Sequence, residues 1–69
     1  MTLSEFIKKK RKESHLTQEM LAQKAGVGLR FVRELEQGKK TLRIDKVNQV
    51  LLLFGATLGP VELPRNEES

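Results

Sequence analysis

The stretch from Thr17 to Lys39, TQEMLAQKAGVGLRFVRELEQGK, decides how this chain folds, because it predicts two short helices separated by a tight turn. Thr17 is suited to cap the first helix, over residues 18–25, and Gly26 is suited to the left-handed conformation that ends it. The second helix, over residues 29–37, has an apolar face formed by Phe31, Val32 and Leu35.

The sequence on either side of this stretch predicts two further helices. Thr2 and Glu5 match a capping box, in which each side chain accepts a hydrogen bond from the other's amide, so a first helix is expected from about Leu3 to Ser14. A fourth helix is predicted by apolar residues at helical spacing, which are Ile44, Val47, Val50, Leu51 and Phe54. The expected fold class is all-α, a compact four-helix domain over residues 1–55 followed by a short strand.

The composition argues against an enzyme. The 69 residues include 13 Lys and Arg against 9 Asp and Glu, one His and no Cys, which gives a net charge of +4. A chain of this length holds one small core, and without Cys it has no thiolate metal site. Glu34 and Glu36 lie about 200° apart around their helix, so they form no paired acid–base site. We therefore expect no catalytic residue, no metal and no cofactor.

The positive charge is unevenly distributed. Residues 1–55 hold 12 Lys or Arg against 6 acidic residues, whereas residues 56–69 hold one Arg against three Glu. A basic body indicates a polyanion as partner. The N-terminus is charged where a signal peptide needs an apolar run, and the longest apolar stretch, Val50–Phe54, is far too short to cross a membrane. A cytoplasmic protein with no membrane partner is expected.

Two short helices joined by a tight turn, the second amphipathic with outward cations, form the helix-turn-helix arrangement. The elements that match it here are Leu16-Thr17-Gln18, Leu21-Ala22, Ala25-Gly26-Val27 and Leu35-Glu36-Gln37-Gly38-Lys39. With them, residues 16–39 closely resemble the lambda-repressor-like (Cro, XRE) DNA-binding family, and the flanking helices extend the resemblance over residues 3–55. The resemblance implies that the helix over residues 29–37 reads base edges in the major groove of double-stranded DNA.

Three residues on the outer side of this recognition helix are the candidates for base contacts: Leu29, Arg30 and Glu34. Arg30 is the first choice, since its guanidinium matches the O6 and N7 atoms of guanine. Leu29 is suited to a thymine methyl group. Glu34 either accepts a hydrogen bond from cytosine N4 or orients Arg30 one turn earlier, and the orienting role is preferred.

A second group of residues is expected to contact DNA phosphates: Thr17, Gln18, Arg33, Lys39, Lys40 and Arg43. Gln18 matches a glutamine of the family that meets a phosphate together with the amides of its helix N-terminus. The cations of the loop over residues 38–43 would follow the same DNA backbone, the alternative being that they only keep the loop solvated. Arg33 is assigned to phosphate rather than to a base.

Other positions are expected to be structural. The resemblance implies a partly buried ion pair between Arg11 and Glu36, which links the first helix to the third. His15 stands where relatives usually have Gly, and we expect it to adopt the left-handed conformation that ends the first helix. Gly28 is a weaker N-cap than the Ser or Thr that is common at its position. Phe31 either joins the core or reaches the DNA surface.

The segment after the fourth helix has a different character. Residues 56–64 suit a short strand, which Pro60 confines to a sheet edge, and the polar residues 65–69 are expected to be disordered. This arrangement is similar to HipB-type antitoxins, whose C-terminal strands pair across a dimer. The dimer interface that it implies consists of Leu52, Leu53, Leu58, Val61 and Leu63. The alternative is that the segment folds over its own helix.

The preferred function is a dimeric, sequence-specific repressor that covers an inverted-repeat operator. The similarity to HipB-type proteins further implies an antitoxin with a HipA-like kinase toxin as partner. Two alternatives stay open, namely a stand-alone or phage-type repressor without a toxin partner, and a protein-interaction module that has lost DNA binding. Arg30 and the basic loop argue against the interaction module.

Overall fold

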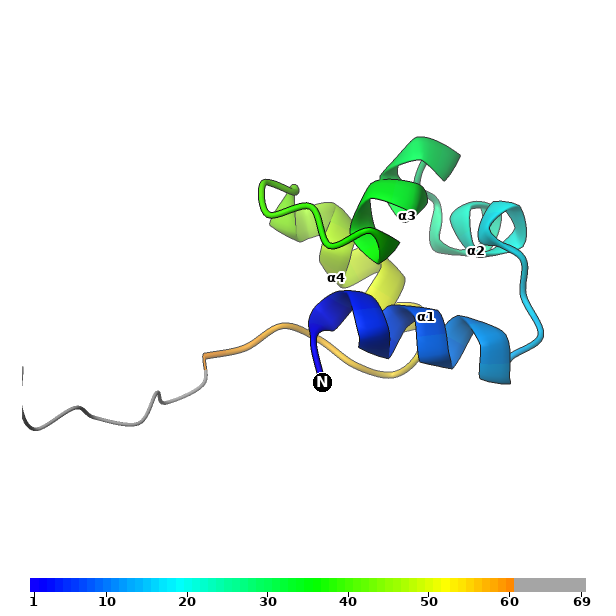
Figure 1. The fold of residues 1–69 in the computed structure, drawn as a ribbon, viewed down its shortest axis with the longest axis horizontal. Helices are drawn as coiled ribbons and strands as arrows, with labels where there is room; N and C mark the ends of the chain where they lie inside the picture. The colour runs from blue at the N-terminus through cyan, green and yellow to red at the C-terminus, as the bar shows by residue number, and fades with distance from the viewer. Residues whose placement is uncertain (61–69) are drawn as a thin grey trace, which may run out of the picture.

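The computed structural model describes residues 1–60, which form four helices and no strand. In chain order they are α1 (Leu3–Glu13), α2 (Gln18–Ala25), α3 (Leu29–Glu36) and α4 (Ile44–Leu53) (Figure 1). The all-α, four-helix prediction is confirmed for this part of the chain. The helices begin where the sequence predicts, and α1, α3 and α4 end one residue early because the last predicted residue of each is a C-cap: Ser14, Gln37 and Phe54.

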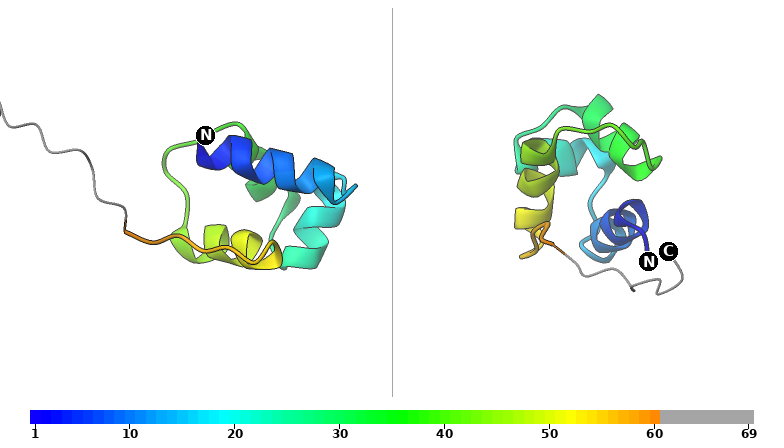
Figure 2. Two further views of the ribbon diagram at one scale, coloured as in Figure 1. Left: turned by 90° about the horizontal axis from the view of Figure 1, so that it is seen from below. Right: turned by 90° about the vertical axis from the view of Figure 1, so that its left-hand side faces the viewer.

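The core lies where the four helices meet. α3 packs against α1 and α2, and α2 also packs against α4 (Figure 2). The buried apolar side chains are Ile7, Leu21, Ala22, Val32, Leu35, Val47, Val50 and Leu51. Every helix contributes to this cluster, so each helix is held mainly by its partners rather than by its own short run of backbone hydrogen bonds. Phe31 is half-buried against the same cluster, which supports the core interpretation of this residue.

The predicted capping box starts α1. The Thr2 hydroxyl accepts a hydrogen bond from the Glu5 amide at 3.2 Å, and the Glu5 carboxylate accepts one from the Thr2 amide at 2.8 Å. Because the Thr2 amide donates to the ionised carboxylate, it lowers the pKa of Glu5 below the ordinary value. The box satisfies amides that the first turn of a helix leaves without partners.

All four helices end in the same kind of turn, in which one residue adopts a positive φ and the next amide donates to a carbonyl five residues earlier. These amide-to-carbonyl distances are 3.1 Å for Leu16 to Arg11, 3.0 Å for Val27 to Ala22, 3.1 Å for Lys39 to Glu34 and 2.9 Å for Ala56 to Leu51. The residues with positive φ are His15 at 57°, Gly26 at 74°, Gly38 at 82° and Gly55 at 72°. The left-handed conformation predicted for His15 is therefore confirmed.

The segment after α4 turns back along that helix (Figure 2). The Asn48 side-chain oxygen accepts hydrogen bonds from the Leu58 amide at 2.9 Å and from the Thr57 hydroxyl at 3.3 Å. Residues 56–58 thus fold over their own helix, the alternative arrangement stated above, and residues 56–60 form no strand. The rest of the predicted strand, with Val61 and Leu63, and the predicted tail 65–69 lie outside the described residues.

We predict that His15→Gly stabilises the protein by about 1 kcal/mol. Removing Cβ relieves the steric strain of the left-handed conformation, and this gain exceeds the conformational entropy that glycine adds to the unfolded chain. Gly26→Ala is the opposite control. Its added Cβ would meet Gln49 at an ordinary 3.6 Å, so its expected loss of about 1–2 kcal/mol comes from the backbone alone. Urea unfolding measures both variants, and a shift of both in the same direction would contradict the prediction.

Candidate nucleic-acid interface

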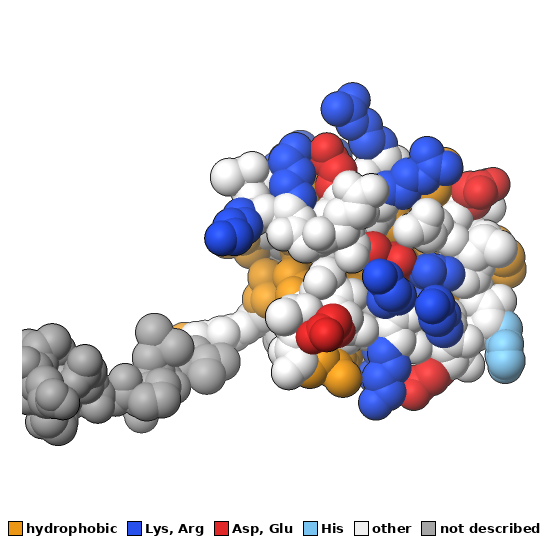
Figure 3. All heavy atoms as spheres, in the orientation of Figure 1, with side chains coloured by type: hydrophobic (Ala, Val, Ile, Leu, Met, Phe, Trp, Pro, Cys, Tyr) orange, Lys and Arg blue, Asp and Glu red, His pale blue; other side chains and the backbone are white. Residues whose placement is uncertain are grey.

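The outer side of α3 presents two arginines. The Arg30 side chain is 92% exposed. Arg33 is also exposed and forms no ion pair within residues 1–60. Figure 3 shows Lys and Arg side chains gathered along the edge of the molecule that α3 and the following loop form. Both guanidiniums therefore lie in solvent at the place where the sequence predicts contacts to DNA.

Leu29, which is also expected to contact a base, is arranged differently. It opens α3 directly after Gly28, which provides no side-chain hydrogen bond to the helix start. Its side chain is half-buried and packs against the core cluster. Only part of Leu29 is therefore accessible, and its contact with a thymine methyl group stays a prediction.

Glu34 lies between two cations. One of its carboxylate oxygens, Oε2, accepts a hydrogen bond from Lys39 Nζ at 3.1 Å. The same oxygen lies 3.7 Å from Arg30 Nε, one helical turn away. Glu34 thus lies within ion-pair distance of Arg30 without a hydrogen bond to it, and its orienting role stays a prediction. The hydrogen bond to Lys39 was not predicted.

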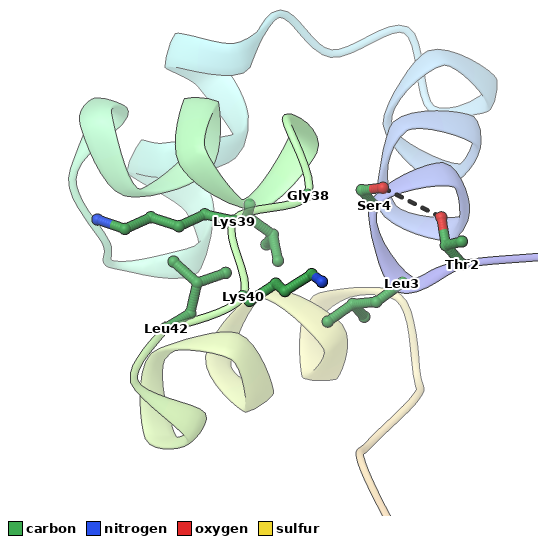
Figure 4. A pocket seen from close by; sticks show the side chains of 8 residues that line it. Thr2, Leu3, Ser4, Gly38, Lys39, Lys40 and Leu42 are labelled. Carbon is green, nitrogen blue, oxygen red and sulfur yellow. Dashed lines mark hydrogen bonds between the residues drawn. The ribbon is translucent and has the colours of Figure 1, made fainter.

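The other two loop cations have separate surroundings. Lys40 lines an open cavity of about 270 Å³ beside the first turn of α1, where it lies near Thr2 and Leu3 (Figure 4). Arg43 precedes α4 and donates two hydrogen bonds to the Asp45 carboxylate, at 2.7 and 3.2 Å. These bonds hold the pKa of Asp45 below its ordinary value. Any phosphate that Arg43 contacts must therefore compete with Asp45.

The first turn of α2 holds the remaining predicted phosphate contacts. The Thr17 hydroxyl oxygen caps the helix by accepting from the Met20 amide at 3.1 Å, which leaves its proton available to an acceptor. Gln18 is half-buried, and its amide nitrogen donates to Glu36 Oε1 at 3.1 Å. The Gln18 side chain is thus fixed by α3, a link that the sequence did not reveal.

Arg11 and Glu36 form the ion pair that the family resemblance implies. Arg11 Nε and Nη2 donate to the two carboxylate oxygens of Glu36, at 2.6 and 3.1 Å. Arg11 Nη1 donates to the carbonyl of Leu16 at 2.9 Å. The Glu36 side chain is only 2% exposed and that of Arg11 is 13% exposed. The pair therefore joins α1, the turn after α1 and α3 in one network with little access to water.

α2 and α3, joined through the left-handed Gly26 and fixed by this network, have the arrangement of a helix-turn-helix unit. Residues 7–60 match the protein family described as Helix-turn-helix. The chain belongs to this helix-turn-helix family. Membership of a helix-turn-helix family also bears out the expectation that the chain is not an enzyme.

A relative of this helix-turn-helix chain is known from Sinorhizobium fredii, where it is named "Uncharacterized HTH-type transcriptional regulator y4mF". The two are 54% identical over 48 residues. The aligned stretch covers 70% of this chain and 63% of the relative, so this chain spans less than two thirds of the relative's length. Within residues 1–60, no helix is long and apolar enough to cross a membrane.

We predict that Glu36→Ala destabilises the protein by about 3–5 kcal/mol, because it leaves the Arg11 guanidinium largely buried without its counter-charge. Glu34→Ala removes the same charge from the same helix at a partly exposed position, and its expected cost is at most about 1 kcal/mol. Denaturant unfolding, compared between the two variants, checks the difference. Similar losses in both would mean that the buried pair contributes no more than the surface one.

Proposed function

We propose that this chain is a DNA-binding transcriptional regulator whose α3 enters the major groove as the recognition helix. The observation that carries the proposal is the pair of exposed arginines, Arg30 and Arg33, on the outer side of the second helix of a helix-turn-helix unit. Membership of the helix-turn-helix family supports it. The name of the Sinorhizobium relative, an HTH-type transcriptional regulator, supports the regulatory part.

In this proposal α3 provides the base contacts and its surroundings provide the phosphate contacts. Arg30 donates to a guanine, and Leu29 and Glu34 complete the base-reading group. The first turn of α2 presents amides and the Thr17 hydroxyl to a phosphate, with Gln18 beside them. The cations that follow the same DNA backbone are Arg33, Lys39, Lys40 and Arg43.

We further propose that residues 1–55 form the DNA-binding domain and that two copies of the chain associate through the end of α4 and residues 56–64. Residues 56–58 take part in this interface while folded over their own helix, because Leu58 stays 40% exposed. Apolar side chains exposed at the end of α4 and just after it support this interface: Leu52 is 73%, Leu53 40% and Leu58 40% exposed. Exposed leucines at this end of the chain are candidates for a surface that a partner covers. A two-fold dimer would present two copies of α3 about 34 Å apart to an inverted-repeat operator, one turn of DNA.

The antitoxin role is the finer part of the proposal. It rests on the resemblance of the sequence after α4 to HipB-type proteins, of which residues 56–60 do not form the expected strand. A HipA-like kinase encoded beside this gene would then be a second partner. Co-purification of the two products tests this role. Absence of a complex, with DNA binding retained, would favour the stand-alone repressor instead.

We predict that Arg30→Ala weakens binding to the operator much more than binding to random duplex DNA. The expected loss at the operator is about 1–3 kcal/mol, the discrimination that a bidentate contact to guanine provides. Electrophoretic mobility shifts on the duplex that the wild-type protein selects from a random pool, and on a scrambled duplex, measure both affinities. Equal weakening on the two duplexes would assign Arg30 to phosphate and not to a base.

A second prediction concerns the dimer. Leu52→Lys places a charge in the proposed interface and is expected to shift the protein from dimer to monomer in sedimentation equilibrium. Ile44→Lys is the matched control, because Ile44 is 66% exposed at the opposite end of the same helix. A Leu52→Lys protein that sediments as the wild-type dimer would place the interface elsewhere.

A further inference from the structure

The turn that ends α3 folds the chain back so that Lys39 lies beside Glu34. Gly38 has a φ of 82°, and the Lys39 amide donates to the Glu34 carbonyl at 3.1 Å. The Lys39 side chain points away from the cavity beside α1 (Figure 4), and its Nζ donates to the Glu34 carboxylate. The backbone of this turn therefore places Lys39 next to Glu34 before their side chains interact.

Two cations share one carboxylate oxygen at this place. Lys39 Nζ lies 3.1 Å from Glu34 Oε2, within hydrogen-bond distance, whereas Arg30 Nε lies 3.7 Å from the same atom. Arg30 makes no hydrogen bond through its side chain to any of residues 1–60. In the free protein, Glu34 is thus held by Lys39, and the guanidinium of Arg30 is not fixed.

We propose that Glu34 couples the phosphate contact of the loop to the base contact of α3. When Lys39 moves to a DNA phosphate, it releases Oε2 of Glu34, and this oxygen then holds the Arg30 guanidinium in place for a guanine. The proposal rests on the proposed DNA-binding function and deepens it, because it makes Glu34 a positioning residue that acts through Arg30.

Charge and reach support such an exchange. A DNA phosphate is a competing anion for the Lys39 ammonium, and the flexible four-carbon stem of a lysine allows it to change partner. Arg30 and Glu34 are one helical turn apart, the spacing at which an arginine and a glutamate pair on a helix surface. Before DNA is bound, the same carboxylate keeps Lys39 from phosphates. Glu34 therefore lowers the affinity for any DNA and raises the discrimination between sequences.

The test is the variant Glu34→Gln, which keeps the shape of the side chain and removes its charge. Binding to a scrambled duplex is expected to strengthen by about two- to fivefold, the range of an exposed ion pair, because Lys39 is freed. The preference for the duplex selected by the wild-type protein is expected to fall. Mobility shifts on the two duplexes at several salt concentrations give both quantities.

Two double variants test the coupling directly. In the K39M background, E34Q is expected to give no gain on the scrambled duplex, and K39M alone should lower the salt slope by about 1. In the R30A background, E34Q is expected to cause no further loss of preference. Glu19→Gln is the control for charge, because Glu19 is exposed on α2 and forms no ion pair within residues 1–60.

The outcomes separate the coupling from the proposed function. The coupling would be overturned if E34Q strengthened binding to the scrambled duplex equally with and without Lys39. It would also be overturned if the effect of E19Q depended on Lys39 in the same way. In either case the effect of E34Q would be only the loss of one negative charge. A wild-type protein that binds neither duplex would overturn the proposed function itself. Thermal unfolding of each variant verifies that it is folded before binding is measured.

Discussion

The buried ion pair of Arg11 and Glu36 is the interaction on which the arrangement of the other elements depends. Glu36 stands in the last turn of α3 and receives hydrogen bonds from α1, through Arg11, and from α2, through Gln18. Among the described residues, no buried side-chain nitrogen or oxygen is left without a hydrogen-bond partner. A carboxylate this deeply buried is tolerated only with such complete pairing. The pair therefore fixes the rotation of α3 about its axis, and with it the side on which Arg30 faces solvent.

The left-handed turns at the helix ends have a comparable effect on the residues that follow them. Leu16, Val27 and Ala56, which follow three of these turns, are folded back onto the core. Lys39 follows the remaining turn, which ends α3, and is folded back onto the outer side of that helix, beside Glu34. The same left-handed turn thus contributes to core packing after α1, α2 and α4. After α3 it contributes to the charge pattern of the candidate DNA surface.

The sequence was sufficient for features that depend on local rules. The capping box of Thr2 and Glu5 follows from neighbouring residues, and the left-handed His15 follows from the family resemblance together with backbone preferences, so both could be predicted. Lys39 is different, because its long side chain can reach either a DNA phosphate or Glu34 and the sequence does not choose between them. Asn48 binds a segment ten residues further on, and no periodicity indicates such a contact. The fold was predictable, whereas the partners of exposed polar side chains needed the structure.

These partners change what the net positive charge of the first 55 residues means for binding. Two of the cations expected to contact DNA phosphates are already paired with carboxylates: Lys39 with Glu34, and Arg43 with Asp45. A DNA phosphate must replace these carboxylates, so each contact contributes only the difference between two ion pairs. Arg33 has no carboxylate partner within residues 1–60, so its full attraction to a DNA phosphate contributes to binding. The attraction to DNA of any sequence is therefore weak. The contact of Arg30 with a base then has a larger part in determining the sequence at which the protein binds.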